Sequence, residues 1–376
     1  MRNQLQLRLF LPLALVVAAG VPAAAAAQDH PPVLPDTAYT PGAYRVFTGA
    51  GEPARLEDVV RAMGGHEVVF IGETHDDPTG HMLERELLAR AYAAYGAPDG
   101  QPKPGAGGET RGAEAASVDA AGGADAGRSR ALALSLEAFE RDVQLVLDEY
   151  LAGLITETAF LADSRPWPRY LTDYRPLVES AKEHGLDVIA ANAPRRYVSR
   201  VTQQGRAALH ELPPAALELL PPLPYGQPSP AYRDQWIAVI SAVMAGETMK
   251  CGVPVEQPPA HAGAHANMGN QLHSQVLWDA SMAYWIARHL DAPEDARTGA
   301  RPDALVLHVV GGFHVARGTG TPEQLEAYRP GTRAMVVMLR PVADVGAFEA
   351  APAGQWGDFV IQTDEARTLE AIECRS

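Results

Sequence analysis

The 376-residue sequence has only two cysteines, Cys251 and Cys374. Two cysteines by themselves cannot make a zinc site of the usual thiolate type, which needs four protein ligands. In an oxidising compartment these two side chains form a disulfide or stay as two unpaired thiols, and both alternatives are compatible with the sequence.

Basic residues are also scarce. Lysine and arginine total 31 against 46 aspartate and glutamate residues, which leaves a formal net charge of −15. Such a balance argues against a nucleic-acid-binding surface as the main function, because phosphate contacts require clustered positive charge. It is compatible with a protein whose ligand is a small molecule, apolar or cationic.

Long apolar runs are absent beyond the N-terminal region. Arg2 and Arg8 precede the apolar run 9–19, and small residues follow it up to Ala27. This pattern is typical of a secretory signal peptide over residues 1–27 with an A-x-A cleavage site. No cysteine lies near that site, and no later segment has about 18 uninterrupted apolar residues, the number needed to span a bilayer. We therefore expect an exported protein, periplasmic or extracellular, with neither a lipid anchor nor a transmembrane segment.

Short apolar runs alternate with amphipathic stretches through most of the chain. Runs of this kind, rich in β-branched residues, predict strands that are buried on both faces. Alternation with helices predicts an α/β fold with three α/β/α layers and a mostly parallel sheet. The predicted strands are 68–72, 131–136, 186–191, 304–310 and 333–339.

Composition changes along the chain suggest its organisation. Residues 97–130 are almost wholly Gly, Ala, Pro, Ser and charged residues, which predicts a disordered insertion. The region 195–290 has helical but no strand-like patterns, which predicts a helical insertion over the carboxyl ends of the strands. The remaining divisions are an extended lead-in over 28–55, one α/β domain over 56–345 and a C-terminal tail over 346–376.

Polar side chains follow the predicted strands directly. Glu73, His75 and Asp76 come right after the strand 68–72, and Pro78 then marks a helix start with Asp76 or Asp77 as its N-cap. Parallel strands place their carboxyl ends at one edge of a sheet, which is where open α/β sheets bind ligands.

Three further strands end in the same way. Glu137, Asn192 and His314 follow them, and both His75 and His314 stand in G-x-x-H patterns that begin at Gly72 and Gly311. Two imidazoles with two carboxylates suit Mn²⁺, Fe²⁺ or Zn²⁺ with open positions for water, and Glu73, His75 and His314 are the predicted ligands. Without a metal, His75 can act as a general base oriented by Glu73 or Glu137. The alternative is that these residues have no function in catalysis or binding and are polar groups at a sheet edge whose hydrogen bonds are made within the protein.

Six motifs carry a resemblance to a known family. They are V-F-I-G-E-T-H-D-D-P-T-G-H (69–81), S-L-E-A-F-E-R-D-V-Q-L-V-L-D-E-Y-L-A-G (135–153), W-P-R-Y-L-T-D-Y-R-P-L-V (167–178), G-L-D-V-I-A-A-N-A-P (185–194), S-Q-V-L-W-D-A-S-M-A (274–283) and V-V-G-G-F-H-V-A-R-G-T-G-T-P (309–322). At these residues the chain resembles the ChaN-like haem-binding uptake proteins, in the superfamily that includes Tiki, TraB and the erythromycin esterases. The matches run in order over most of residues 56–340, apart from the insertion.

The resemblance implies haem binding, a role in iron uptake and a capacity to form homodimers around haem. Its Tiki and esterase branches imply instead a hydrolase, metal-dependent in Tiki, whose active site would use His75, His314 and Glu73. Tyr225 and Tyr232 are the candidate axial haem ligands, since a phenolate can hold ferric haem iron, and Arg195 is a candidate for a propionate. His261, His265 and His273 lack a regular ligand spacing, so we expect them in solvent or beside a site. The chain departs from the family's lipoprotein pattern because it has no lipobox cysteine.

Two functions follow as hypotheses. The first is an exported haem or iron-binding protein that acts in haem or iron uptake. The second is a divalent-metal-dependent hydrolase, an esterase or protease, in which Glu73, His75, Glu137 and His314 are catalytic.

Overall fold

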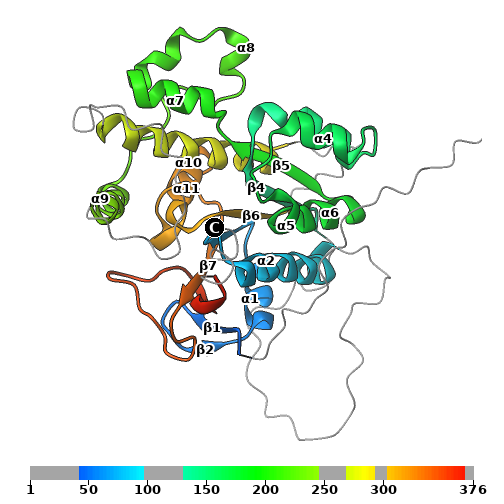
Figure 1. Cartoon of the computed structure of the whole chain (residues 1–376), viewed down its shortest axis with the longest axis vertical. Helices are drawn as coiled ribbons and strands as arrows, with labels where there is room; N and C mark the ends of the chain where they lie inside the picture. The colour runs from blue at the N-terminus through cyan, green and yellow to red at the C-terminus, as the bar shows by residue number, and fades with distance from the viewer. Residues whose placement is uncertain (1–41, 97–129, 245–267, 293–302, 369–376) are drawn as a thin grey trace, which may run out of the picture. The chain divides into compact units, whose positions relative to one another are not determined.

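The computed structural model describes residues 42–96, 130–244, 268–292 and 303–368 (Figure 1). Its strands are β1 (Tyr44–Thr48), β2 (Pro53–Ala54), β3 (Val68–Glu73), β4 (Leu132–Glu140), β5 (Asp187–Asn192), β6 (Leu305–Gly311), β7 (Ala334–Val342) and β8 (Phe359–Asp364). Its α-helices are α1 (Leu56–Met63), α2 (Pro78–Ala91), α3 (Gln144–Leu151), α4 (Glu157–Ser164), α5 (Tyr170–Asp173), α6 (Arg175–His184), α7 (Arg195–Gln204), α8 (Pro214–Leu217), α9 (Pro230–Met244), α10 (Met268–Leu290) and α11 (Thr321–Tyr328).

The strands form one eight-stranded sheet in the order β2-β1-β8-β7-β3-β6-β4-β5. From β8 to β5 every neighbouring pair is parallel, and only β1 pairs antiparallel, with β2 and β8. All five predicted strands are present within one or two residues of their expected starts, so the predicted mostly parallel α/β fold is confirmed.

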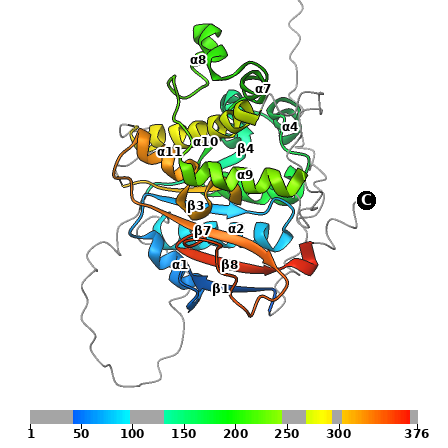
Figure 2. The same cartoon turned by 90° about the vertical axis from the view of Figure 1, so that its left-hand side faces the viewer.

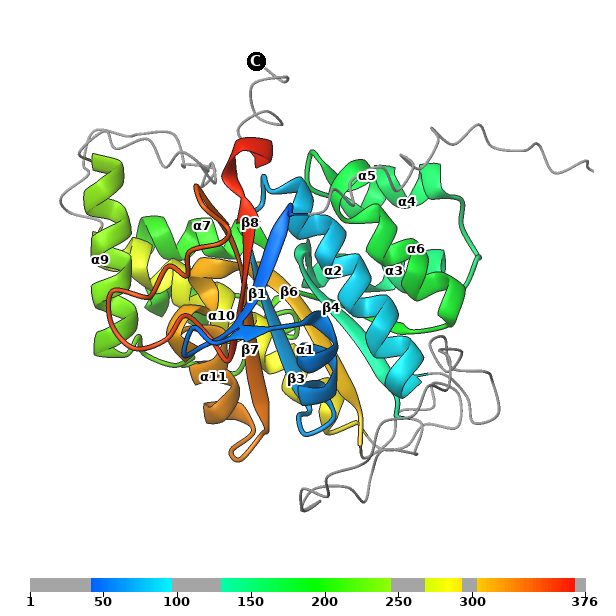
Figure 3. The ribbon, with the colours of Figure 1, turned by 90° about the horizontal axis from the view of Figure 1, so that it is seen from below.

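Helices cover both faces of the sheet, as Figure 3 shows with the sheet seen on edge. On one face, alternate strand residues such as Val69 and Ile71 pack with α1, α2, α3 and α6 in one buried apolar cluster. On the other face, Val68 and Phe70 pack with α10 and α11. Alternation along a strand sends successive side chains to opposite faces, which is why the four residues 68–71 of β3 are all apolar.

The predicted helical insertion divides into two parts. Helix α10 belongs to the helical layer that covers the sheet, because Met282, Ala283 and Ile286 pack on the strands. Its other side carries Leu272 and Val276, which form a third buried cluster with α7, α9 and the segment between them. Figure 2 shows α7 and α8 on the side of α10 that faces away from the sheet. Part of the insertion lies over the strand ends as predicted, because Gln235 of α9 donates to the carbonyl of Phe313, which follows β6 directly, at 2.8 Å. Helices α7 and α8 lie instead on the far side of α10 (Figure 2).

The C-terminal region also differs from the predicted tail. Within it, β8 pairs with both β7 and β1, so residues 359–364 lie inside the sheet. Two residues of the predicted tail, Gln362 and Thr363, are almost completely buried. The run F-V-I-Q-T is too short and too polar to stand out as a buried strand in the sequence.

Several predictions fall outside the described residues. These are the signal peptide 1–27, Cys251, Cys374, His261, His265 and residues 97–129 of the predicted disordered insertion. Arg130, the last residue of that insertion, is tied to its surroundings, because its guanidinium donates to the carbonyls of His66 (2.7 Å) and Asp303 (2.8 Å). Within the described part of the chain, the structure has no helix that is long and apolar enough to cross a membrane.

Candidate functional site

The strand order brings the predicted residues to one edge of the sheet. β3, β6, β4 and β5 are consecutive neighbours, and Glu73 and Asn192 are the last residues of β3 and β5. His314 closes a short 3₁₀ helix, η4 (Gly312–His314), directly after β6. Asp77 rather than Asp76 caps α2, since its carboxylate accepts from the Thr79 amide at 3.0 Å. Asp76 instead forms an ion pair with Arg169.

Glu137 lies at an irregularity in β4. Regular pairing of β4 with β5 and β6 stops at Leu136, and the register shifts before Glu140. The Glu137 carboxylate turns to the end of β6, where Oε2 accepts the Gly311 amide at 2.7 Å. Asn192 supports the same turn by donating from Nδ2 to the Glu137 carbonyl at 3.1 Å. A β-bulge of this kind redirects a side chain at a strand end.

Glu73 and His75 form the first carboxylate–histidine pair of the site. His75 Nδ1 lies 2.6 Å from Glu73 Oε1, and the Tyr174 hydroxyl donates to the same oxygen at 2.5 Å. Burial by itself would lower the pKa of His75, but the hydrogen bond and the charge of Glu73 outweigh it and raise that pKa. Burial would likewise raise the pKa of Glu73, and the positive charge at His81 with the hydrogen bond from His75 lowers it instead.

Asp279 and His314 form the second pair. His314 Nδ1 lies 2.9 Å from Asp279 Oδ1, an oxygen that also accepts from the Thr321 hydroxyl at 2.8 Å. Burial works to lower the pKa of His314, but the charges of Asp279 and Glu137 outweigh it and raise that pKa to about 9.

Glu137 stands between the two histidines. His314 Nε2 lies 3.7 Å from Glu137 Oε1, and the Glu137 charge raises the pKa of both His75 and His314. Gly311 lets the groups approach, because a Cβ there would lie 3.0 Å from His75 Nε2 and 3.4 Å from Glu137 Oε2. Each imidazole thus has Nδ1 fixed by a carboxylate, so Nε2 remains for a ligand, a proton or a metal.

Access from solvent separates the two histidines. The His75 side chain keeps 15% of its surface exposed, whereas His314 keeps 8%. The Trp167 ring meets His75 edge-on at 4.8 Å between ring centroids, so an apolar wall borders its accessible side. His75 is therefore the more exposed histidine of the two.

Four residues of this region were not predicted as site residues: His81, Glu84, Tyr174 and Asp279. His81 Nδ1 lies 3.1 Å from Glu84 Oε2 and 3.3 Å from Glu73 Oε2, beneath the Glu73–His75 pair. For Asp279 the sequence signal was a charged residue on an apolar helix stripe. Asp279 follows Val276 by three residues and precedes Ala283 by four, and it is 1% exposed.

The predicted haem residues lie in three different environments. The Tyr225 hydroxyl donates to the His273 carbonyl at 2.9 Å, and burial raises the pKa of Tyr225 to about 12. Tyr232 is 1% exposed and its ring packs on Phe313 at 5.2 Å. Arg195 forms an ion pair with Glu140. Both phenols are buried, Tyr225 in the segment before α9 and Tyr232 in α9, so neither is open to a large flat ligand in this structure.

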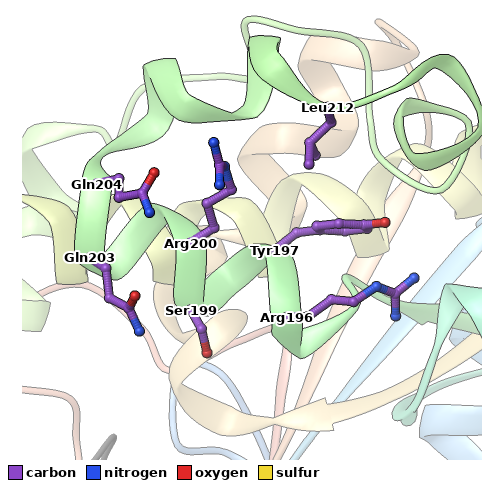
Figure 4. Close-up of a pocket in the computed structure, with 7 residues that line it drawn as sticks. All are labelled: Arg196, Tyr197, Ser199, Arg200, Gln203, Gln204 and Leu212. Carbon is purple, nitrogen blue, oxygen red and sulfur yellow. The ribbon is translucent and has the colours of Figure 1, made fainter.

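A surface groove runs along α7 (Figure 4). Its volume is about 470 Å³, and Tyr197 and Arg200 line it from α7 while Leu212 lines it from the facing segment. The Arg196 guanidinium lies over the Tyr197 ring, 4.5 Å from its centroid. Arg196 and Arg200 also pair with Asp142 and Glu211.

Comparisons with known proteins agree with this fold. A family model described as haem-binding uptake, Tiki superfamily, ChaN matches residues 110–325. No curated protein matches the chain. The structure is similar to that of ChaN of Campylobacter jejuni, reported with cofacial haem binding, at 12% identity over 85% of this chain and 96% of that chain, with a TM-score of 0.54. An erythromycin esterase mutant in its open conformation matches at 11% identity over 85% of this chain and 83% of that chain, with a TM-score of 0.36.

Proposed function

The chain belongs to the ChaN family of haem-binding uptake proteins in the Tiki superfamily, and from that premise we propose that it binds haem as cargo and takes part in haem or iron uptake outside the cytoplasm. The observation that carries the proposal is the family match over residues 110–325, more than half of the chain. Export rests on the signal-peptide pattern at residues 1–27. A homodimer around haem is part of the same proposal.

The α7 groove has the chemistry that haem needs. Ferric haem iron accepts a phenolate ligand, and its propionates pair with guanidinium groups. Tyr197 is half-buried at the groove, and Arg196 and Arg200 stand on the same helix beside it. A volume of about 470 Å³ lies within the range of small-molecule sites. We propose Tyr197 as the iron ligand and the two arginines as propionate partners, ahead of the enclosed phenols Tyr225 and Tyr232.

A haem titration of the purified mature protein tests the proposal. We expect a saturable Soret shift at stoichiometric haem, and at least a tenfold loss of affinity in Tyr197→Phe. Tyr92→Phe is a matched control, because Tyr92 is also half-buried but its ring contacts His184, with the ring centroids 4.0 Å apart. If haem affinity is lost in Tyr225→Phe or Tyr232→Phe instead, that tyrosine is the iron ligand and the haem-binding function stands. A wild-type protein without a Soret shift would overturn it.

A second candidate, a hydrolase, is favoured by one specific observation. Two histidines held by carboxylates flank Glu137 at the strand ends, with the Nε2 atoms left for chemistry. In this proposal His75 takes a proton from an attacking water, because it is accessible and Glu73 stabilises its charged form. His314 and Glu137 would hold the other side of an ester or peptide, or a divalent Mn, Fe or Zn ion together with Glu73 and His75.

Hydrolysis of a panel of aryl esters and peptides separates the two candidates. His75→Ala and His314→Ala should each reduce kcat/KM by about 10²-fold or more if these groups supply acid–base catalysis. Haem affinity should stay within twofold of the wild-type value in both variants. Unchanged hydrolysis in either variant would rule this candidate out, and a parallel loss of haem affinity would place haem at the strand ends.

A further inference from the structure

Next to the Glu73–His75 pair lies a cluster of three buried ionisable side chains, Glu73, His81 and Glu84. Their relative exposures are 4%, 7% and 0%. One ligand atom from each lies within 4.8 Å of the others, and the described residues contain no other group of three or more with this property. Burying two carboxylates without compensating charge is strongly unfavourable.

The hydrogen bonds of His81 determine which of its nitrogens is available. His81 Nε2 lies 3.0 Å from the backbone carbonyl of His75, which can only accept a hydrogen bond, so Nε2 carries the proton. In neutral His81 the lone pair is then on Nδ1, and it faces the carboxylates of Glu73 (3.3 Å) and Glu84 (3.1 Å). Three acceptors that face one another require a cation or further protons among them.

Two carboxylate oxygens of the cluster also lack partners. Glu73 Oε2 and Glu84 Oε1 are fully buried and accept no hydrogen bond from any described residue. Glu73 Oε1 is in contrast saturated by His75 and Tyr174. Glu73 Oε2, the oxygen that accepts no hydrogen bond, is the one that lies 3.3 Å from His81 Nδ1.

We propose that Glu73, His81 and Glu84 hold one divalent first-row transition ion, of the Mn²⁺ or Zn²⁺ type, in the interior between β3 and α2. Imidazole nitrogen with two carboxylates is an N/O donor set that such ions accept. Ligands about 2.0–2.2 Å from an ion lie about 2.9–3.5 Å from one another, and the separations of 3.1 and 3.3 Å fall in this range. The contact of His81 Nε2 with a backbone carbonyl is the support that metal-bound histidines usually have.

The ion would act on the strand-end site through one carboxylate. Glu73 would bind the ion through Oε2 and would hydrogen-bond His75 Nδ1 through Oε1. The ion and His75 would therefore share one carboxylate. This site differs from the predicted set of Glu73, His75 and His314, because only Glu73 is common to both. It goes beyond haem binding, which the same protein would perform with or without the ion.

Metal content and metal-dependent stability test the proposal on the full mature chain. Protein that is unfolded in chelator and refolded with MnCl₂ or ZnCl₂ should retain about one ion per chain after dialysis. Its Tm should rise relative to protein refolded without metal. Glu84→Gln keeps the shape but removes the charge, and it should bind the ion at least tenfold more weakly, with no metal-dependent rise in Tm.

Glu137→Gln is the matched control, because Glu137 is also buried but belongs to the strand ends. It should retain the ion. Loss of the ion in Glu137→Gln but not in Glu84→Gln would assign the metal to the strand-end histidines and overturn the proposal. So would a wild-type chain without a stoichiometric ion. If Glu84→Gln does not fold, electron spin echo spectra of the wild-type Mn²⁺ form decide, since nitrogen modulation must appear and must disappear in His81→Gln.

Discussion

At the scale of single residues, the histidines of this protein differ because of what their ring nitrogens meet. His75 and His314 meet carboxylates, which stabilise the charged imidazolium. His308 in β6 lies 2.9 Å from the Ser135 hydroxyl and packs edge-on against Phe70. The charge of His314 also works to lower the pKa of His308. Burial therefore lowers the pKa of His308 to about 3.

His308 should make folding sensitive to mild acid. The unfolded chain takes up a proton near pH 6.5 and the folded chain does not until about pH 3, so stability present above pH 6.5 is lost as the pH falls between these values. The loss from this one group should approach about 1.4 kcal/mol per pH unit. Urea unfolding at pH 7, 6, 5 and 4 measures it. His308→Asn should show a smaller slope over this range, and an identical slope would contradict the assignment.

The residues that sequence reasoning found and missed differ in one physical respect. Glu73, His75, Glu137 and His314 stand directly after apolar runs, so their places at the strand ends follow from local pattern. Asp279 and Tyr174 reach the site from helices that are distant in the chain, and only tertiary packing decides which side chains of a helix meet a strand end. Tyr225 and Tyr232 show the same limit, since their enclosure depends on how α9 and α10 pack.

At the scale of elements, α2 depends on a strand from the far end of the chain. Its N-cap Asp77 is 0% exposed, and its carboxylate accepts from the Thr363 hydroxyl of β8 at 2.6 Å as well as from the Thr79 amide. Burial raises the pKa of Asp77. Hydrogen bonds from Thr363 and from the start of α2 work in the opposite direction but do not outweigh burial. The start of the helix that carries His81 and Glu84 is thus fixed by β8.

Asp77→Ala should lower the free energy of unfolding by about 1–3 kcal/mol, because it removes a helix cap and leaves the buried Thr363 hydroxyl without its acceptor. Chemical denaturation followed by circular dichroism gives the value. Asp234→Ala provides the comparison, since Asp234 is exposed on α9 and its loss should change stability by less than about 0.5 kcal/mol. Equal effects would show that the cap is unimportant.

At the scale of the whole molecule, the sheet has two parts. The sequence predicts the five strands from β7 to β5, but it does not predict the three strands β2, β1 and β8 at the other end of the sheet. The inner strands are continuous apolar runs, since helices cover both of their faces. β1, β2 and β8 form the antiparallel edge, and their shorter, more polar sequences resemble loops. The fold class was therefore predictable, whereas the true extent of the folded domain was not.

Truncation measures that extent. A chain that ends at residue 350 lacks β8, so it exposes the edge of β7. It also removes the Thr363 hydroxyl that donates to Asp77, and it leaves β1 paired with β2 alone. We expect it to be largely unfolded or aggregated by circular dichroism and size-exclusion chromatography. A chain that ends at residue 368 keeps β8 and should behave as the full protein does. A folded, monomeric 350-residue chain would contradict this role of β8.

The position of β8 between β1 and β7 also governs when folding can finish. β1 is the first described strand to leave a ribosome or a translocation channel, yet its main partner in the sheet is the last. Contacts so distant in the chain form late, because the intervening polypeptide must first be released and then closed into a loop. A polypeptide that is delivered N-terminus first consequently keeps an unfinished sheet edge until residue 364 has emerged. Such a delay makes the interval before β8 docks the period of greatest exposure to proteases and aggregation.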